Sequence, residues 1–238
     1  EKIKLFGRCK QYVGNSCLII AGTGSNSTAH SIELSIAAQE AGADALLVVS
    51  PYYNKATPDG LILHYLSICQ SVSIPVIIYN VPSRTGVDIP ISVYHALSKI
   101  PNIVGVKEAS SDVTKIAKIR NTCGPDFSIW SGTDDQIVPV MSLGGKGCIS
   151  VLSNLLPKES VKMCEAFFAG DVKTAAKMQL DFIPLVDALF SEVNPIPVKA
   201  AMAKMGYCED YLRLPLTQME DKNREVLYEE MRKMGIEV

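Results

Sequence analysis

Lys107 is the residue of this sequence with the clearest potential for chemistry, because it lies near the end of a strand-like apolar run, Ile103–Ala109. An ammonium group beside hydrocarbon is poorly solvated, so we expect the pKa of this lysine to fall. A lysine that is neutral near physiological pH attacks carbonyl carbon, and an imine is the usual product. The alternative is a structural lysine paired with a carboxylate such as Glu108 or Asp134.

Two other side chains stand where they could assist Lys107. Tyr79 ends the preceding strand-like run, and a phenol at that height can carry protons to and from a carbinolamine. The alternative for Tyr79 is a structural role, as a buried aromatic residue whose hydroxyl is hydrogen-bonded within the protein. Arg84 follows in a loop rich in proline and glycine, and its planar guanidinium suits a substrate carboxylate. A salt bridge that orders the loop is the alternative for Arg84.

Two consecutive tyrosines, Tyr52 and Tyr53, follow another strand-like run. Because neighbouring residues cannot both face inward, we expect one to point into the site and the other toward a neighbouring subunit. The segment Gly22–Asn26 resembles a phosphate-binding loop but lacks its further glycine and its lysine, so we interpret it as a tight turn. The three histidines lie in helical stretches, and their spacing supports neither a metal site nor a catalytic triad.

These residues belong to a regular alternation of apolar runs and amphipathic stretches. The apolar runs are continuous rather than alternating, as in parallel strands covered on both faces. Polar and glycine-rich segments follow the strands at one end, which is how a TIM-type (β/α) barrel builds its site. A doubly wound open sheet is the alternative fold. The predicted strands are Leu18–Thr23, Ala45–Ser50, Val76–Val81, Ile103–Ala109, Ser128–Gly132 and Gly147–Leu152, and the predicted helices between them are Thr28–Gly42, Asp59–Val72, Pro90–Lys99, Thr114–Cys123 and Gln136–Leu143.

The strand pattern stops near residue 171, and residues 171–190 and 220–234 are helical in pattern. We therefore predict two parts: residues 1–170, an incomplete (β/α) barrel with the catalytic residues, and residues 171–238, a C-terminal helical region. Six of the eight strands of such a barrel are recognisable. The proline-containing segment Asn194–Lys199 is predicted to separate the two C-terminal helices.

Composition narrows the class of protein. With 238 residues, 47% of them hydrophobic, the chain can bury a large core. A net charge of -2 gives no electrostatic case for nucleic acid or an anionic membrane, and no apolar run is long enough to span a bilayer. Seven cysteines without a CxxC pair or metal-ligand spacing predict free thiols. The charged first ten residues predict no secretory signal, so we expect a cytoplasmic protein.

Several motifs together resemble the 4-hydroxy-tetrahydrodipicolinate synthase (dihydrodipicolinate synthase) family. This family belongs to the pyruvate-dependent class I aldolase superfamily, which includes N-acetylneuraminate lyase. The motifs occur in the family's order and run through most of the chain: Ser50–Asn54, Tyr79–Gly86, Val106–Ala109, Gly144–Gly147, Asn194–Lys199 and Leu212–Pro215.

The resemblance implies an enzyme of lysine and diaminopimelate biosynthesis that condenses pyruvate with L-aspartate-4-semialdehyde. By position, Lys107 is similar to the imine-forming lysine and Tyr79 to the proton-relay tyrosine. Arg84 matches the arginine that binds the aldehyde's carboxylate, and Tyr53 the tyrosine donated across a dimer interface. Gly132 and Ile149 match positions that line the pyruvate pocket. No cofactor is implied besides the covalent imine with pyruvate, and a homo-oligomer, dimer or tetramer, is expected.

The sequence departs from the family pattern in two places. The family begins with two further βα units, including a Gly-Thr-Thr-Gly-Glu motif that nothing here matches, so the chain is N-terminally short against that pattern. We therefore expect low or absent activity and abnormal assembly for residues 1–238 alone. His30 also stands where lysine-inhibited members have a glutamate, although Asn26 and Tyr52 match the rest of that site. We expect weak or no inhibition by lysine, which a dose–response curve tests.

Two alternative functions remain open at the level of sequence. One is another pyruvate-dependent aldolase, acting on a sugar acid as N-acetylneuraminate lyase does. Arg84 favours the synthase, because the sugar-acid aldolases lack it in the family pattern. The other is an inactive truncated form or scaffold subunit that keeps the site residues without a working pocket.

Overall fold

A computed structural model describes all residues, 1–238, and divides the chain into two compact units. The first unit comprises residues 1–132 and 142–146, and the second comprises residues 133–141 and 147–238. The two-part division predicted at residue 170 stays a prediction. None of the helices is long and apolar enough to cross a membrane.

The first unit is built on a five-stranded parallel sheet. Its strands follow one another in space in the order of the chain, β1-β2-β3-β4-β5. A doubly wound sheet reverses its strand order at a switch point, whereas a (β/α) barrel winds on in one direction. The observed order therefore supports the predicted barrel-type fold. The strands are β1 (Ile20–Gly22), β2 (Ala45–Val49), β3 (Val76–Asn80), β4 (Ile103–Glu108) and β5 (Ser128–Ser131).

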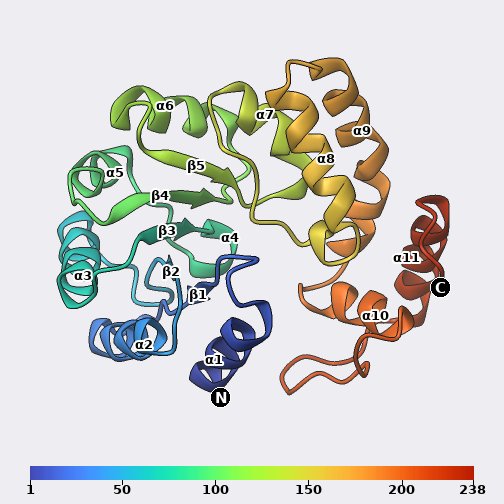
Figure 1. Ribbon diagram of the computed structural model, residues 1–238, viewed down its shortest axis with the longest axis horizontal. Coiled ribbons are helices and arrows are strands. Elements are labelled where there is room, and N and C mark those ends of the chain that lie inside the picture. Colours follow the sequence, from blue (N-terminus) through green and yellow to red (C-terminus); the bar gives the residue numbers. More distant parts are fainter. The chain divides into compact units, whose positions relative to one another are not determined.

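Helices alternate with these strands, and four of them, α2, α3, α5 and α6, form a row along the sheet (Figure 1). Local capping explains where several begin. The side chains of Ser27, Thr57 and Asp112 each accept a hydrogen bond from a backbone N–H of the first helical turn. The helices of this unit are α1 (Lys2–Val13), α2 (Thr28–Glu40), α3 (Pro58–Ser71), α4 (Pro82–Thr85), α5 (Ile91–Leu97) and α6 (Val113–Cys123).

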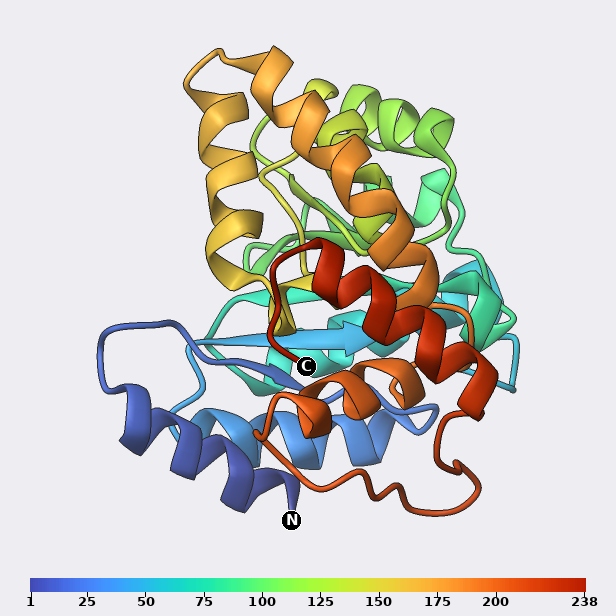
Figure 2. The ribbon, with the colours of Figure 1, turned by 90° about the vertical axis from the view of Figure 1, so that its right-hand side faces the viewer.

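The second unit is helical, with a core of aliphatic and methionine side chains that include Leu185, Leu189, Leu227 and Met231. Helices α9 and α11 lie side by side in it (Figure 2). Both were predicted from sequence. The elements are η1 (Asp134–Gln136), α7 (Ile137–Ser142), η2 (Leu152–Asn154), α8 (Pro157–Phe168), α9 (Val172–Leu189), α10 (Ile196–Lys204) and α11 (Asp221–Lys233).

The segment Asn194–Lys199 lies between α9 and α11 as predicted, and a further helix, α10, begins within it. Proline is favoured in the first turn of a helix, where its missing N–H has no partner to lose.

The predicted strand Gly147–Leu152 is wrong, since only Cys148 has a strand-like bridge there. The backbone N–H groups of Val151 and Leu152 instead donate to Asp134 Oδ2, both at 2.9 Å. A side chain thus takes the hydrogen bonds that a neighbouring strand would have taken.

Candidate active site

Lys107 and Tyr79 lie side by side at the carboxyl ends of β4 and β3. The two residues are register partners in the sheet, and Lys107 Nζ is 4.3 Å from the centroid of the Tyr79 ring. Burial raises the pKa of the Tyr79 phenol, and the guanidinium of Arg84 opposes part of that rise. The phenol is therefore protonated at neutral pH, so it can donate a proton and accept one in return.

A cavity of about 310 Å³ opens at the same end of the sheet. Its walls are mostly aliphatic, while Arg84 and two tyrosines supply polar groups. Such a combination suits a small molecule with an anionic end. The cavity is lined by Gly22, Gly24, Leu47, Val49, Tyr52, Tyr79, Val81, Arg84 and Thr85.

Arg84 reaches this cavity from α4, the single turn of helix that follows β3. The turn is held by Thr85, whose Oγ1 is 3.2 Å from Val81 O and 3.0 Å from Val87 O and accepts the Val87 N–H at 3.2 Å. These bonds hold the backbone of the turn, while the Arg84 side chain is exposed. The structure thus brings Arg84 to the cavity that Tyr79 also lines.

Gly132 follows β5 and lies against the stem of Lys107. Its N–H donates to Glu108 O at 2.7 Å. A Cβ added at Gly132 would lie 2.6 Å from Ala109 Cβ and 3.1 Å from Lys107 Cε. The contact with Ala109 is closer than real Cβ atoms come and the contact with Lys107 is tight, so a larger residue at position 132 would displace the backbone next to Lys107.

Tyr52 and Tyr53 point in different directions. Tyr52 is 40% exposed and lines the cavity, whereas Tyr53 is 90% exposed. Tyr53 also has φ of 73°, a left-handed conformation that is uncommon for a bulky residue and often marks functional positions. An exposed aromatic held in a strained backbone fits a side chain presented to another subunit.

Ile149 lies in the second unit and is half-buried, next to Cys148. The segment that follows it is fastened by Asp134, which is itself anchored because Gln179 Nε2 donates to its backbone oxygen at 2.8 Å. The segment after Ile149 therefore has a defined course within its unit.

The sequence patterns predicted no role for Asn80, and they indicated Glu108 only as a possible partner of Lys107. Both are buried at the ends of otherwise apolar strands, at 0% and 3% exposed. A polar residue that ends a buried strand must find hydrogen-bond partners, so its position was the available signal. Glu108 accepts from Asn80, Tyr94 and Ser110 rather than serving only as a counter-ion.

Comparison with known proteins identifies the family. The model of the dihydrodipicolinate synthetase family matches residues 1–234. The 4-hydroxy-tetrahydrodipicolinate synthase of Thermoanaerobacter sp. (strain X514) is 53% identical over 219 residues, 92% of this chain and 74% of that protein. The enzyme of the same name from Lachnoclostridium phytofermentans is 50% identical over 237 residues, 99% of this chain and 81% of that protein.

Solved structures agree with the sequence matches. A crystal structure of dihydrodipicolinate synthase from Thermotoga maritima superimposes with a TM-score of 0.96 at 38% identity, covering 99% of this chain and 81% of that one. A monomeric dihydrodipicolinate synthase variant superimposes with a TM-score of 0.97 at 38% identity, covering 100% of this chain and 80% of that one. The chain therefore belongs to the dihydrodipicolinate synthetase family.

Proposed function

We propose that this chain is a class I aldolase-type lyase that condenses pyruvate with L-aspartate-4-semialdehyde to give 4-hydroxy-tetrahydrodipicolinate, in the biosynthesis of diaminopimelate and lysine. Its relatives at about half identity are synthases of that name. The observation that carries the proposal is the position of Lys107 Nζ. It lies 4.3 Å from the centroid of the Tyr79 ring, at the carboxyl ends of β4 and β3. No cofactor is required, because the lysine itself forms the covalent intermediate.

The first half of the reaction activates pyruvate. The neutral amine of Lys107 attacks C2 of pyruvate and gives a carbinolamine. Tyr79 donates a proton to the departing hydroxyl, which leaves as water, and a protonated imine and a Tyr79 phenolate remain. The phenolate then takes a proton from C3, which converts the protonated imine to an enamine, a carbon nucleophile.

The second half joins the two substrates. C3 of the enamine attacks the aldehyde carbon of the semialdehyde, while Arg84 binds the carboxylate of that substrate. The amino group of the semialdehyde then attacks C2 and displaces Lys107. The ring closes, the lysine amine is regenerated, and the two substrates have lost one water in total.

A second copy of the chain completes the proton relay in this proposal. Tyr53 extends into solvent in a single chain, so its hydroxyl would serve the site of a neighbouring subunit. Gly132 would line the pyruvate pocket beside the stem of Lys107.

The aldehyde substrate separates this proposal from a sugar-acid aldolase. Purified protein is incubated with pyruvate and either aspartate semialdehyde or N-acetylmannosamine, and products are identified by mass. We expect a product equal to the two substrates minus one water, and only with the semialdehyde. If the protein condensed pyruvate with N-acetylmannosamine but not with the semialdehyde, it would be a sugar-acid aldolase instead.

The role of Arg84 is tested in the same assay with Arg84→Met. Removing a charge-assisted hydrogen bond should raise KM for the semialdehyde about 10- to 100-fold. The matched control is Arg8→Met, which removes an exposed arginine of α1. An unchanged KM in Arg84→Met would remove Arg84 from the site.

A further inference from the structure

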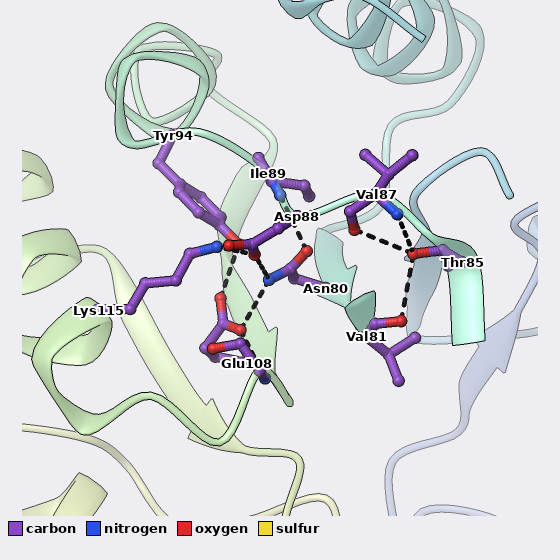
Figure 3. Close-up of polar contacts among 10 residues, drawn as sticks. Asn80, Val81, Thr85, Val87, Asp88, Ile89, Tyr94, Glu108 and Lys115 are labelled. Carbon is purple, nitrogen blue, oxygen red and sulfur yellow. Dashed lines mark hydrogen bonds and ion pairs between the residues drawn. The ribbon is translucent and has the colours of Figure 1, made fainter. Parts of the chain in front are cut away.

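A buried carboxylate directly follows Lys107 in β4. Glu108 is 3% exposed, and three donors converge on it (Figure 3). Its Oε1 accepts from Asn80 Nδ2 at 2.8 Å and from Ser110 N at 2.9 Å, and its Oε2 accepts from Tyr94 Oη at 2.7 Å. A carboxylate is costly to bury without such donors, so these contacts define where Glu108 can lie.

The sheet couples this carboxylate to the reactive pair. Tyr79 pairs with Lys107 in the register of β3 and β4, and Asn80 pairs with Glu108 one residue further on. Since successive side chains of a strand point to opposite faces, the reactive pair lies on one face and Asn80 with Glu108 on the other. The backbone that carries Asn80 and Glu108 is thus continuous with the backbone that carries Tyr79 and Lys107.

Asn80 extends the same network to the loop that carries Arg84. Its two amide hydrogens are used by Glu108 Oε1 and by Asp88 Oδ1, the latter at 2.9 Å (Figure 3). Its Oδ1 accepts the N–H of Ile89 at 3.1 Å. Because Arg84 lies between Asn80 and Asp88, these bonds close the loop around it.

Two neighbouring helices hold the outer side of the network. Tyr94 comes from α5, and burial followed by the nearby Glu108 carboxylate raises the pKa of its phenol well above the ordinary value. The phenol thus remains a donor at all relevant pH values. Lys115 of α6 is 6% exposed and pairs with Asp88, so the Asp88 carboxylate has a cationic partner.

From this geometry we infer that Glu108 and Asn80 are positioning residues for the condensation of pyruvate with the semialdehyde. This inference rests on the proposed function. The two residues do not touch the reacting atoms. Their hydrogen bonds fix the ends of β3 and β4, and with them Lys107, Tyr79 and the loop of Arg84, in the relative placement that imine formation needs.

Two substitutions at Glu108 test this role in the full chain. Glu108→Met keeps the length of the side chain but removes both acceptors. Glu108→Gln keeps Oε1 for Asn80 and Ser110, and its amide can donate to Tyr94 Oη. The measured quantity is the rate constant of borohydride-trapped imine formation on Lys107 at saturating pyruvate, per mole of folded protein.

We expect Glu108→Met to lower this rate constant about 100-fold, as displacements of about 1 Å do. Glu108→Gln should stay within about fivefold of the unsubstituted protein, because one neutral hydrogen bond replaces a charged one. The matched control is Asp44→Asn at the opposite, amino end of the sheet, where Asp44 accepts from Ile19 N and Lys10. This control should lose stability without a change in the trapping rate.

Equal rate constants in Glu108→Met and the unsubstituted protein would overturn the positioning role. So would a Glu108→Gln protein as slow as Glu108→Met, since charge rather than geometry would then matter.

Hydrogen exchange separates this inference from the proposed function. If the unsubstituted protein forms no pyruvate adduct, the proposed function fails, yet the exchange rates of the Ser110 and Ile89 amides still decide the structural claim. Faster exchange of both amides in Glu108→Met, but not in Asp44→Asn, supports a network that holds the two strand ends. Unchanged exchange overturns it.

Discussion

At the scale of single residues, the reactive centre depends on how each side chain is surrounded. Lys107 lies over the ring of Tyr79, whose phenol is kept protonated by burial. Gly132 gives the lysine stem its space. The identities of Lys107, Tyr79 and Arg84 could be proposed from the sequence because each ends or follows an apolar run. The need for glycine at position 132 could not, because it depends on a close approach between two strands.

Tyr79→Phe tests the proton relay. The substitution keeps the ring beneath Lys107 and removes only the hydroxyl, so we expect kcat to fall about 100- to 1,000-fold with little change in thermal stability. Tyr12→Phe, at an exposed position of α1, is the matched control. If Tyr79→Phe retained full turnover, another group would have to transfer the proton.

Gly132→Ala tests the space beside the lysine. The added methyl would meet Ala109 and Lys107, so we expect a loss of about 1–3 kcal/mol in the free energy of unfolding and at least a tenfold loss of turnover. Gly7→Ala in α1 is the control, because the nearest atom to its added Cβ is the backbone oxygen of Ala41, 3.9 Å away. Normal stability and turnover in Gly132→Ala would contradict the observed close approach.

At the scale of secondary-structure elements, the sequence predicted the sheet well because its strands are buried on both faces and its polar loops follow one end. The five strands lie within the predicted ranges. The pattern failed at residues 147–152, where an apolar run looks like a strand although the Asp134 carboxylate takes its N–H groups. It also gave no indication that Asn80 and Glu108 would meet, since that contact depends on the register of two strands.

A histidine joins helices α2 and α3 and makes stability depend on pH. His64 Nδ1 lies 2.9 Å from Thr28 Oγ1, while its Nε2 is buried without a hydrogen-bond partner. Burial lowers the pKa of His64 to about 4, below the value of 6.5 expected in the unfolded chain. Between these values the unfolded chain binds a proton that the folded chain does not, so stability falls as the pH falls through this window.

Denaturant unfolding measures this effect. We expect the unsubstituted protein to lose about 2 kcal/mol more than His64→Gln between pH 7 and pH 5. His95→Gln, which removes an exposed histidine of α5, should behave like the unsubstituted protein. An identical pH dependence in His64→Gln would show that His64 does not cause the loss.

At the scale of the whole molecule, the proposal requires more than one chain. Tyr53 is exposed and strained in a single copy, which suits a residue that acts on a neighbour. One of the matched structures is a monomeric dihydrodipicolinate synthase variant.

Mixing two inactive variants tests action between subunits. Tyr53→Phe and Lys107→Ala should each have little activity alone. If Tyr53 acts on the neighbouring site, each mixed dimer contains one intact site, so random mixing should restore about one quarter of the unsubstituted activity. No recovery in verified mixed oligomers would show that Tyr53 acts within its own chain or not at all.

The central claim is that Lys107 forms an imine with pyruvate, and borohydride reduction followed by peptide mass spectrometry tests it most directly. With pyruvate present, we expect one reduced pyruvate on the peptide containing Lys107, and none on Lys107→Ala. Lys118→Met, at an exposed lysine of α6, should still be labelled. Correctly folded protein that carries no adduct, or carries it on another lysine, would contradict the account and favour a non-catalytic scaffold.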